Sequence, residues 1–193
     1  MNVTPEEAQE ALAAIQQTTV KTRRGLAYYA YQQILWGLLW FVGFLISQFV
    51  QPATLNWIWI VMPILGVIGS AIVGISQGRR MRITPDSRLA FISSRVGMFF
   101  GILYGFGIIW FVVLQPLKAL QIALFWITLV MFGYIVAGAW LRISLLIGIG
   151  VGVTVMSLLG YYLLPGDYYL LMALFGGGTL VVHGLYWLHP WRR

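Results

Sequence analysis

A histidine inside the last apolar segment is the residue best placed to carry chemistry. His183 follows three consecutive glycines and lies one helical turn after Thr179. An ionisable group at membrane depth marks a functional site by default, and imidazole changes its charge close to neutral pH. His183, with Thr179 beside it, is therefore a candidate proton or ligand site, or a haem ligand. The alternative is a neutral histidine that donates a hydrogen bond to a carbonyl or hydroxyl of a neighbouring helix.

A second candidate is a pair of arginines at the start of the third apolar segment. Arg88 and Arg95 are seven residues apart, so a helix places them on one face, beside Ser93 and Ser94. Such a pair can form a basic pocket for a lipid headgroup or another anionic ligand. Alternatively, both side chains extend to the membrane surface near Asp86 and bury only their stems.

Several chemistries are excluded by what the sequence lacks. It contains no cysteine, which removes thiolate catalysis, iron–sulfur clusters and cysteine-bound zinc. Its acids are Glu6, Glu7 and Glu10 near the start and Asp86 and Asp167 in turns. No carboxylate is then embedded in the membrane, which disfavours a carrier that couples to protons or sodium through an acid. We therefore expect no catalytic residue, no bound cofactor and no metal site.

The elements that hold these residues follow from the composition. Of 193 residues, 60% are apolar and only 9% are charged, whereas soluble domains carry about 25% charged residues. A water-soluble domain is excluded, and so is a disordered chain, which requires low hydrophobicity and high charge. The sequence is that of an integral membrane protein.

Six continuous apolar runs are each long enough for a membrane-spanning helix, which needs about 20 residues. They do not alternate polar and apolar residues, which excludes barrel strands. The fold class is therefore an all-α six-transmembrane-helix bundle over residues 26–193. The predicted spans are Leu26–Val50, Leu55–Ser76, Leu89–Leu114, Ile122–Leu141, Ile143–Leu164 and Tyr168–Leu188.

The cations predict the orientation. With six spans, eleven of the twelve lysines and arginines fall on one side and Lys118 alone on the other. Cytoplasmic loops are enriched in lysine and arginine, so both termini are predicted to be cytoplasmic. The net charge of +7 then indicates attraction to anionic inner-leaflet lipids and not binding to nucleic acid.

The three predicted outer turns are alike, because each is short and contains a proline. The prolines are Pro52, Pro116 and Pro165. This likeness, with a weak echo of residues 34–37 in residues 102–105, favours three consecutive helical hairpins. Repeats of this kind are common in transporters, although they also occur in proteins that transport nothing.

Residues 1–25 are predicted to form a separate cytoplasmic segment, a short amphipathic helix with a basic flank. Thr4 and Glu7 fit a capping box around Pro5. The helix either lies on the inner leaflet or docks on a cytoplasmic partner or a second copy of the chain.

Three glycines share one face of the third predicted span. Gly97, Gly101 and Gly105 are spaced four residues apart, and small residues at this spacing let helices approach closely in lipid. The face either packs against another helix of the same chain or forms the interface of a homo-oligomer.

The chain resembles a loose group of small, uncharacterised bacterial multi-pass membrane proteins of similar length. The likeness is carried by residues 21–24 (Lys-Thr-Arg-Arg), 35–43, 131–136 and 174–178 (Leu-Phe-Gly-Gly-Gly). The resemblance implies the bacterial cytoplasmic membrane and assigns no catalytic residue.

Three functions fit these features. The favoured one is a non-enzymatic accessory or regulatory membrane protein that acts by self-association or with a cytoplasmic or membrane partner. The second is a small oligomeric transporter or channel, and the third is a haem- or pigment-binding redox protein that uses His183. A membrane enzyme acting on lipid has the least support.

Overall fold

The computed structural model describes residues 4, 9, 29–80, 87–115 and 117–188. Over these residues it is helical without strands, and six helices are long and apolar enough to cross a membrane. The predicted all-helical class and the presence of six helices of spanning length are thus confirmed for the described part. The predicted amphipathic segment 1–25 falls outside the described residues except for Thr4 and Gln9.

Each of the six predicted spans corresponds to one helical stretch. The first helix covers Tyr29–Phe49, and the last span, Pro165–Leu188, is built from four short elements. The largest difference is α2, which extends beyond the predicted Leu55–Ser76 at both ends. The helices after the first are α2 (Pro52–Arg80), α3 (Ser87–Val113), α4 (Ala119–Leu141) and α5 (Ser144–Leu163); η1 (Pro165–Asp167), α6 (Tyr168–Met172), η2 (Ala173–Gly178) and α7 (Thr179–Leu188) form the last span.

Prolines and one left-handed residue set several of these boundaries. Pro52 and Pro165 each stand at the first position of a helical element, where the missing N–H has no intrahelical partner to lose. Arg142 ends α4 with φ of 57°, and the backbone N–H of Ile143 then reaches the carbonyl of Gly138 at 2.8 Å. This left-handed cap reverses the chain into α5.

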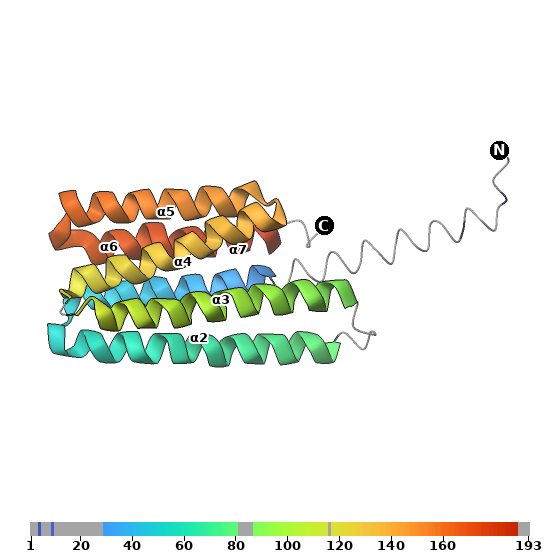
Figure 1. Ribbon diagram of the computed structural model, residues 1–193, viewed down its shortest axis with the longest axis horizontal. Helices are drawn as coiled ribbons and strands as arrows, with labels where there is room; N and C mark the ends of the chain where they lie inside the picture. Colours follow the sequence, from blue (N-terminus) through green and yellow to red (C-terminus); the bar gives the residue numbers. More distant parts are fainter. Residues whose placement is uncertain (1–3, 5–8, 10–28, 81–86, 116, 189–193) are drawn as a thin grey trace.

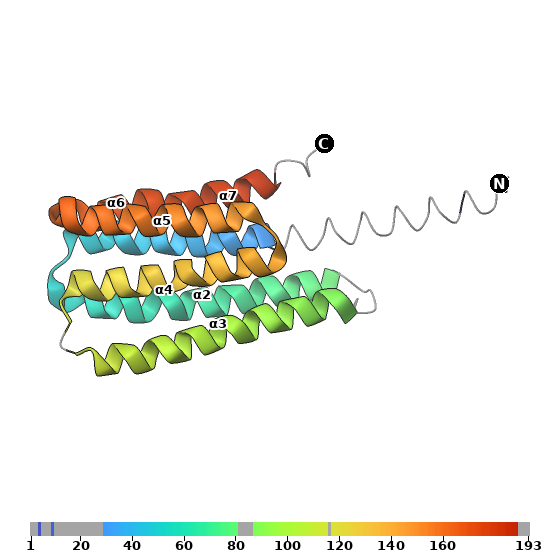
Figure 2. The same cartoon turned by 45° about the horizontal axis from the view of Figure 1, so that its top comes forward.

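The helices run side by side along one long axis, with α2 and α3 together on one flank (Figures 1 and 2). These two helices contribute little to the core. Only 6% of the most apolar stretch of each is buried, against 33–39% in the other four spans. The structure is therefore a four-span core with two peripheral helices.

The core lies where the first helix, α4, α5 and the last span meet. Its buried members come from each of these four parts of the chain. They are Phe44, Ile127, Val130, Met131, Ile149, Val153, Tyr168, Met172, Ala173 and Leu180.

The closest helix contact joins the first helix to the last span. A Cβ added to Gly177 of η2 would lie 2.6 Å from the Cα of Phe41, and one added to Gly37 would lie 2.9 Å from the carbonyl oxygen of Gly177. A Cβ on Gly184 of α7 would lie 2.8 Å from the carbonyl oxygen of Ala30. The backbones of the first helix and the last span therefore touch. We call Gly37, Gly177 and Gly184 the closed glycines.

A second close contact joins α4 to α5. A Cβ on Gly138 would meet the backbone nitrogen of Ile147 at 2.9 Å, and one on Gly150 would meet the carbonyl oxygen of Met131 at 2.8 Å. The closest packing therefore pairs first with last and fourth with fifth. The three predicted hairpins pair the first span with the second, the third with the fourth and the fifth with the sixth. The closest backbone contacts therefore do not follow the hairpins.

Side-chain hydrogen bonds join the first helix to its neighbours. The hydroxyl of Ser70 on α2 donates to Oε1 of Gln32 at 2.8 Å and accepts from the indole of Trp36 at 3.1 Å. At the other end, Gln48 Nε2 donates to the carbonyl of Gly166 at 2.9 Å, and Gln48 Oε1 accepts from the backbone N–H of Leu170 at 3.1 Å. The first helix is thus bound to α2 and to the start of the last span.

Candidate functional site

His183 lies inside the bundle, as its sequence position suggests, and its side chain is 4% exposed. One turn later on α7, the indole of Trp187 donates a hydrogen bond of 2.8 Å to Nε2 of His183. Because an indole nitrogen is only a donor, Nε2 carries no proton in this arrangement, and a neutral ring holds its proton on Nδ1. His183 thus accepts a hydrogen bond from its own helix, whereas the alternative drawn from the sequence had it donate one to a carbonyl or hydroxyl of a neighbouring helix.

The ring of His183 also packs against Tyr29 of the first helix. The two rings meet edge to face with centroids 5.7 Å apart. Within the described residues, His183 Nδ1 and the Tyr29 hydroxyl are buried side-chain atoms without a hydrogen-bond partner. A buried polar group left unpaired costs about 1–3 kcal/mol, so two such groups on facing rings form an uncommon pair.

A second polar pair joins the first helix to α4. The hydroxyl of Tyr134 donates to Oε1 of Gln33 at 3.0 Å, and Gln33 is itself 7% exposed. Gln33 lies one turn after Tyr29, so both project from the same face of the first helix. Three helices therefore contribute to an interior polar cluster, which consists of Tyr29, Gln33, Tyr134, His183 and Trp187.

Thr179 and Arg95, the other predicted ligand residues whose side chains are described, do not join this cluster. Thr179 is half-buried on α7, one turn before His183. Arg95 is exposed on α3, in surroundings unlike the enclosed His183. Arg88 belongs to α3, but its side chain is outside the described residues, as is Asp86. The proposed basic pocket therefore stays a prediction.

Tyr29 and Gln33 belong to the cluster, but the sequence analysis missed them. The available signal was two polar residues one turn apart at the start of the first apolar run, where Tyr28, Tyr31 and Gln32 are polar as well. This signal is weak, because tyrosines and glutamines also occur near the ends of spans without any role.

The interior polar cluster has few ligand groups for a metal and little space for a haem macrocycle. The described residues contain no group of three or more histidines, cysteines or carboxylates that could hold a metal ion. A haem would have to use Nδ1 of His183, since Nε2 accepts the bond from Trp187. Beside that ring, α7 touches the first helix through Gly184, so a macrocycle there would require the two helices to separate.

A different feature stands out on α3, the glycine face predicted from the sequence. A Cβ added to Gly97, Gly101 or Gly105 would have no described atom within 4 Å. The helix meets α4 on another side, where a Cβ on Gly133 would lie 2.8 Å from Leu103. The described residues of the same chain therefore do not pack over these three glycines. We call Gly97, Gly101 and Gly105 the open glycine face.

Comparison of the chain with known protein families, with curated proteins and with solved structures finds no match. A function therefore has to be argued from the interior polar cluster and the open glycine face themselves.

Proposed function

We propose that the protein is a non-enzymatic accessory protein of the bacterial cytoplasmic membrane that acts by associating with a second copy of itself. The single observation that carries this proposal is the open glycine face of α3, which presents bare backbone with no described neighbour within 4 Å. The same face is also suited to an α3-like helix of a membrane partner.

The energetic argument starts from the cost of glycine. Within a helix, each glycine is about 1 kcal/mol less favourable than alanine. Most glycines in this bundle have an evident use, because neighbouring atoms of the same chain pack directly over them, as at Gly37, Gly133 and Gly150. The open face gains no such contact. A second helix packed over these three residues would supply it, since close backbone approach drives helix association in lipid.

The position of α3 supports the same conclusion. It lies on the flank of the bundle with α2 (Figures 1 and 2). Only 6% of its most apolar stretch is buried. Two copies with the same orientation can pair through α3 about a two-fold axis along the membrane normal. Such symmetric pairs are the commonest assembly of identical chains.

Dilution in lipid vesicles tests the proposal. The chain has no cysteine, so one introduced cysteine carries a dye, and energy transfer between copies is followed as the lipid-to-protein ratio rises. Gly101→Ile places a branched side chain in the middle of the open face, and we expect dimerisation to weaken at least about tenfold, equivalent to roughly 1.4 kcal/mol.

The matched control is Gly152→Ile on α5, because Gly152 is also open, with nothing described within 4 Å of its Cβ position. We expect this variant to dimerise normally. Dimerisation that survives Gly101→Ile, or that is lost in Gly152→Ile instead, contradicts an α3 interface. A wild-type chain that stays monomeric at all ratios contradicts self-association itself.

We further propose that the end of the bundle holding the α4–α5 turn is cytoplasmic. The end of α2 and the end of α7 lie at this same end (Figure 1). Support comes from the predicted arrangement of eleven cations on that side and from the enrichment of such residues in cytoplasmic loops. Labelling of a cysteine placed next to Arg142, in sealed cells and then in opened ones, tests the orientation.

The interior polar cluster favours a second candidate, a small oligomeric transporter or channel. Its specific observation is the pair of unpartnered atoms on Tyr29 and His183. The direct backbone contact between the first helix and the last span at the closed glycines argues against this candidate.

Proton flux tests it. If the protein is a transporter or channel, vesicles that hold it should carry protons faster than empty vesicles, and His183→Phe should abolish the difference. Equal rates in protein and empty vesicles would argue for the accessory role.

A further inference from the structure

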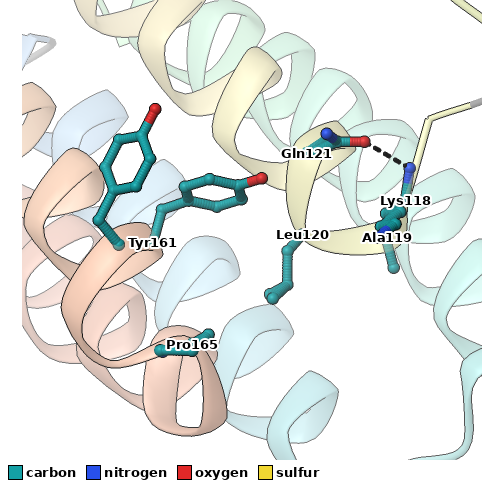
Figure 3. A pocket seen from close by; sticks show the side chains of 7 residues that line it. Lys118, Ala119, Leu120, Gln121, Tyr161 and Pro165 are labelled. Carbon is teal, nitrogen blue, oxygen red and sulfur yellow. Dashed lines mark hydrogen bonds between the residues drawn. The ribbon is translucent and has the colours of Figure 1, made fainter.

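A cavity of about 400 Å³ lies at the end of the bundle opposite the α4–α5 turn. It is formed by the first turn of α4, the last turn of α5 and the start of η1 (Figure 3). Its lining includes Lys118, Leu120, Gln121, Tyr161, Tyr162 and Pro165. The cavity belongs to neither the interior polar cluster nor the open glycine face.

The polar side chains around this cavity are hydrogen-bond donors. Lys118 supplies an ammonium group and the two tyrosines supply phenol hydroxyls. Oε1 of Gln121 accepts the backbone N–H of Lys118 at 2.9 Å (Figure 3), which leaves the amide N–H groups of Gln121 to face other partners. A cavity bordered by donors and one positive charge favours an anion.

Among the described residues, no carboxylate lines the cavity. The nearest acid along the chain, Asp167, is exposed at the end of η1, and it is not among the lining residues. The remaining lining is apolar and comes mainly from Leu120 and Pro165. The ligand that fits this combination has an anionic group beside an apolar part.

The cavity lies at the level where such a ligand is found. Lys118 directly precedes α4, and Tyr161 and Tyr162 lie in the last turn of α5, so all three mark the ends of membrane spans. Tyrosines are enriched at this depth, between the hydrocarbon and the headgroups, and lysines near a membrane surface attract anionic lipids.

We propose that this cavity binds the phosphodiester headgroup of an anionic phospholipid. The phosphate lies against Lys118, the phenol hydroxyls and the Gln121 amide, and the glycerol and first acyl carbons lie on Leu120 and Pro165. By the orientation proposed above, the lipid belongs to the outer leaflet, on the side opposite the eleven other cations. The proposal does not depend on association through α3.

Photocrosslinking with a local readout tests it. The full chain is reconstituted in phosphatidylcholine vesicles that contain a small fraction of a photoreactive phosphatidylglycerol. Crosslinked peptides are then identified by mass spectrometry. We expect crosslinks on the peptides that hold residues 117–121 and 161–165. Lys118→Gln should reduce their yield about fivefold, as the loss of one cation beside anionic lipid predicts, and Lys118→Arg should retain most of it.

The matched control is Arg142→Gln, which removes one cation at the other end of α4 and should leave these crosslinks unchanged. Tyr161→Phe combined with Tyr162→Phe should reduce them less than Lys118→Gln, because the charge remains. Lys118 is exposed, so folding of its variants is checked by their helical circular dichroism and should be unaffected.

Three results overturn the proposal. Equal crosslinking by a photoreactive phosphatidylcholine would show that the headgroup charge is not recognised. An unchanged yield in Lys118→Gln would show that the cavity does not hold the phosphate. Displacement of the lipid by millimolar inorganic phosphate would show that the site takes a free anion and not a lipid.

Discussion

The closed glycines and the open glycine face place the same residue type in opposite roles. At Gly37 and Gly177, the missing Cβ lets two helices of one chain touch backbone to backbone. At Gly97, Gly101 and Gly105, the missing Cβ leaves bare backbone that no described atom covers. Glycine spacing therefore indicates where a helix can be approached closely, but it does not indicate by what.

The comparison also separates folding from assembly. The closed glycines lie in the four-span core, where a substitution acts on the folded chain. The open face lies on α3, which contributes little to that core, so a substitution there acts on association. The two regions thus predict different readouts for chemically equal substitutions.

The largest expected effect comes from Gly177→Ala. The new Cβ would lie 2.6 Å from the Cα of Phe41 and 2.8 Å from the carbonyl oxygen of Gly37. Both are backbone atoms that cannot turn aside, so the helices must separate. We expect a loss of about 2–3 kcal/mol in the free energy of unfolding, in the range of an overpacked core, measured by reversible unfolding in mixed micelles.

The neighbouring residue gives the control for that prediction. A Cβ on Gly178 would lie 3.8 Å from its nearest atom, the carbonyl oxygen of Ala173, which is ordinary contact. Gly178→Ala should therefore leave stability within about 0.5 kcal/mol of the original chain or raise it slightly. Equal destabilisation by both variants would mean that the π-helical backbone of η2, and not the closed contact, determines the effect.

A smaller effect is expected from a polar contact of the same core. Ser157 of α5 and Tyr168 of α6 share a hydrogen bond of 2.8 Å, and both side chains are fully buried. Ser157→Ala leaves the phenol unpaired and should cost about 1 kcal/mol of unfolding free energy, since such bonds in membranes contribute about 0.6 and at most about 1.7 kcal/mol.

The double variant Ser157→Ala with Tyr168→Phe completes the cycle. It removes both partners, so it should cost less than the two single variants added together. Strict additivity would show that the two hydroxyls do not depend on each other.

The smallest effect on folding is expected from Gly101→Ala on the open face. No described atom lies within 4 Å of the new methyl group, and alanine favours a helix over glycine. The unfolding free energy should stay unchanged or rise by up to about 1 kcal/mol. Energy transfer between labelled copies should fall, although less than in Gly101→Ile. A clear loss of monomer stability would place an unrecognised contact on this face.

Much of the fold was accessible from the sequence, because a membrane span is encoded in consecutive residues. The apolar runs predicted six helices of spanning length, but Pro52 and Pro165, which we placed in outer turns, are the first residues of helical elements. The extension of α2 to Arg80 was missed, since the polar residues after Ser76 end the apolar run without ending the helix. Hydropathy reports the membrane boundary, whereas hydrogen bonding decides where a helix stops.

Only part of the interior polar cluster could be predicted from the sequence, because its members come from distant parts of the chain. His183 stands out because an ionisable residue is rare in an apolar span. Tyr29, the group that it faces, is far away in the sequence and unremarkable in type. Likewise, glycines 176–178 belong to a π-helix, η2, and Gly177 packs on Phe41, which is far away in the sequence.

The sequence by itself determined the all-helical class, the six apolar runs long enough to span a membrane and the predicted side of the cations. These features depend on composition and on consecutive residues, because the free energy of transferring a segment into a bilayer depends on that segment's own residues. Only the tertiary structure decided that the first helix touches the last span, that Tyr29 meets His183, and that three glycines of α3 remain uncovered. In lipid, apolar character does not choose helix partners, because lipid tails are equally apolar. The choice depends on the fit between specific surfaces, and that fit exists only once the helices are assembled.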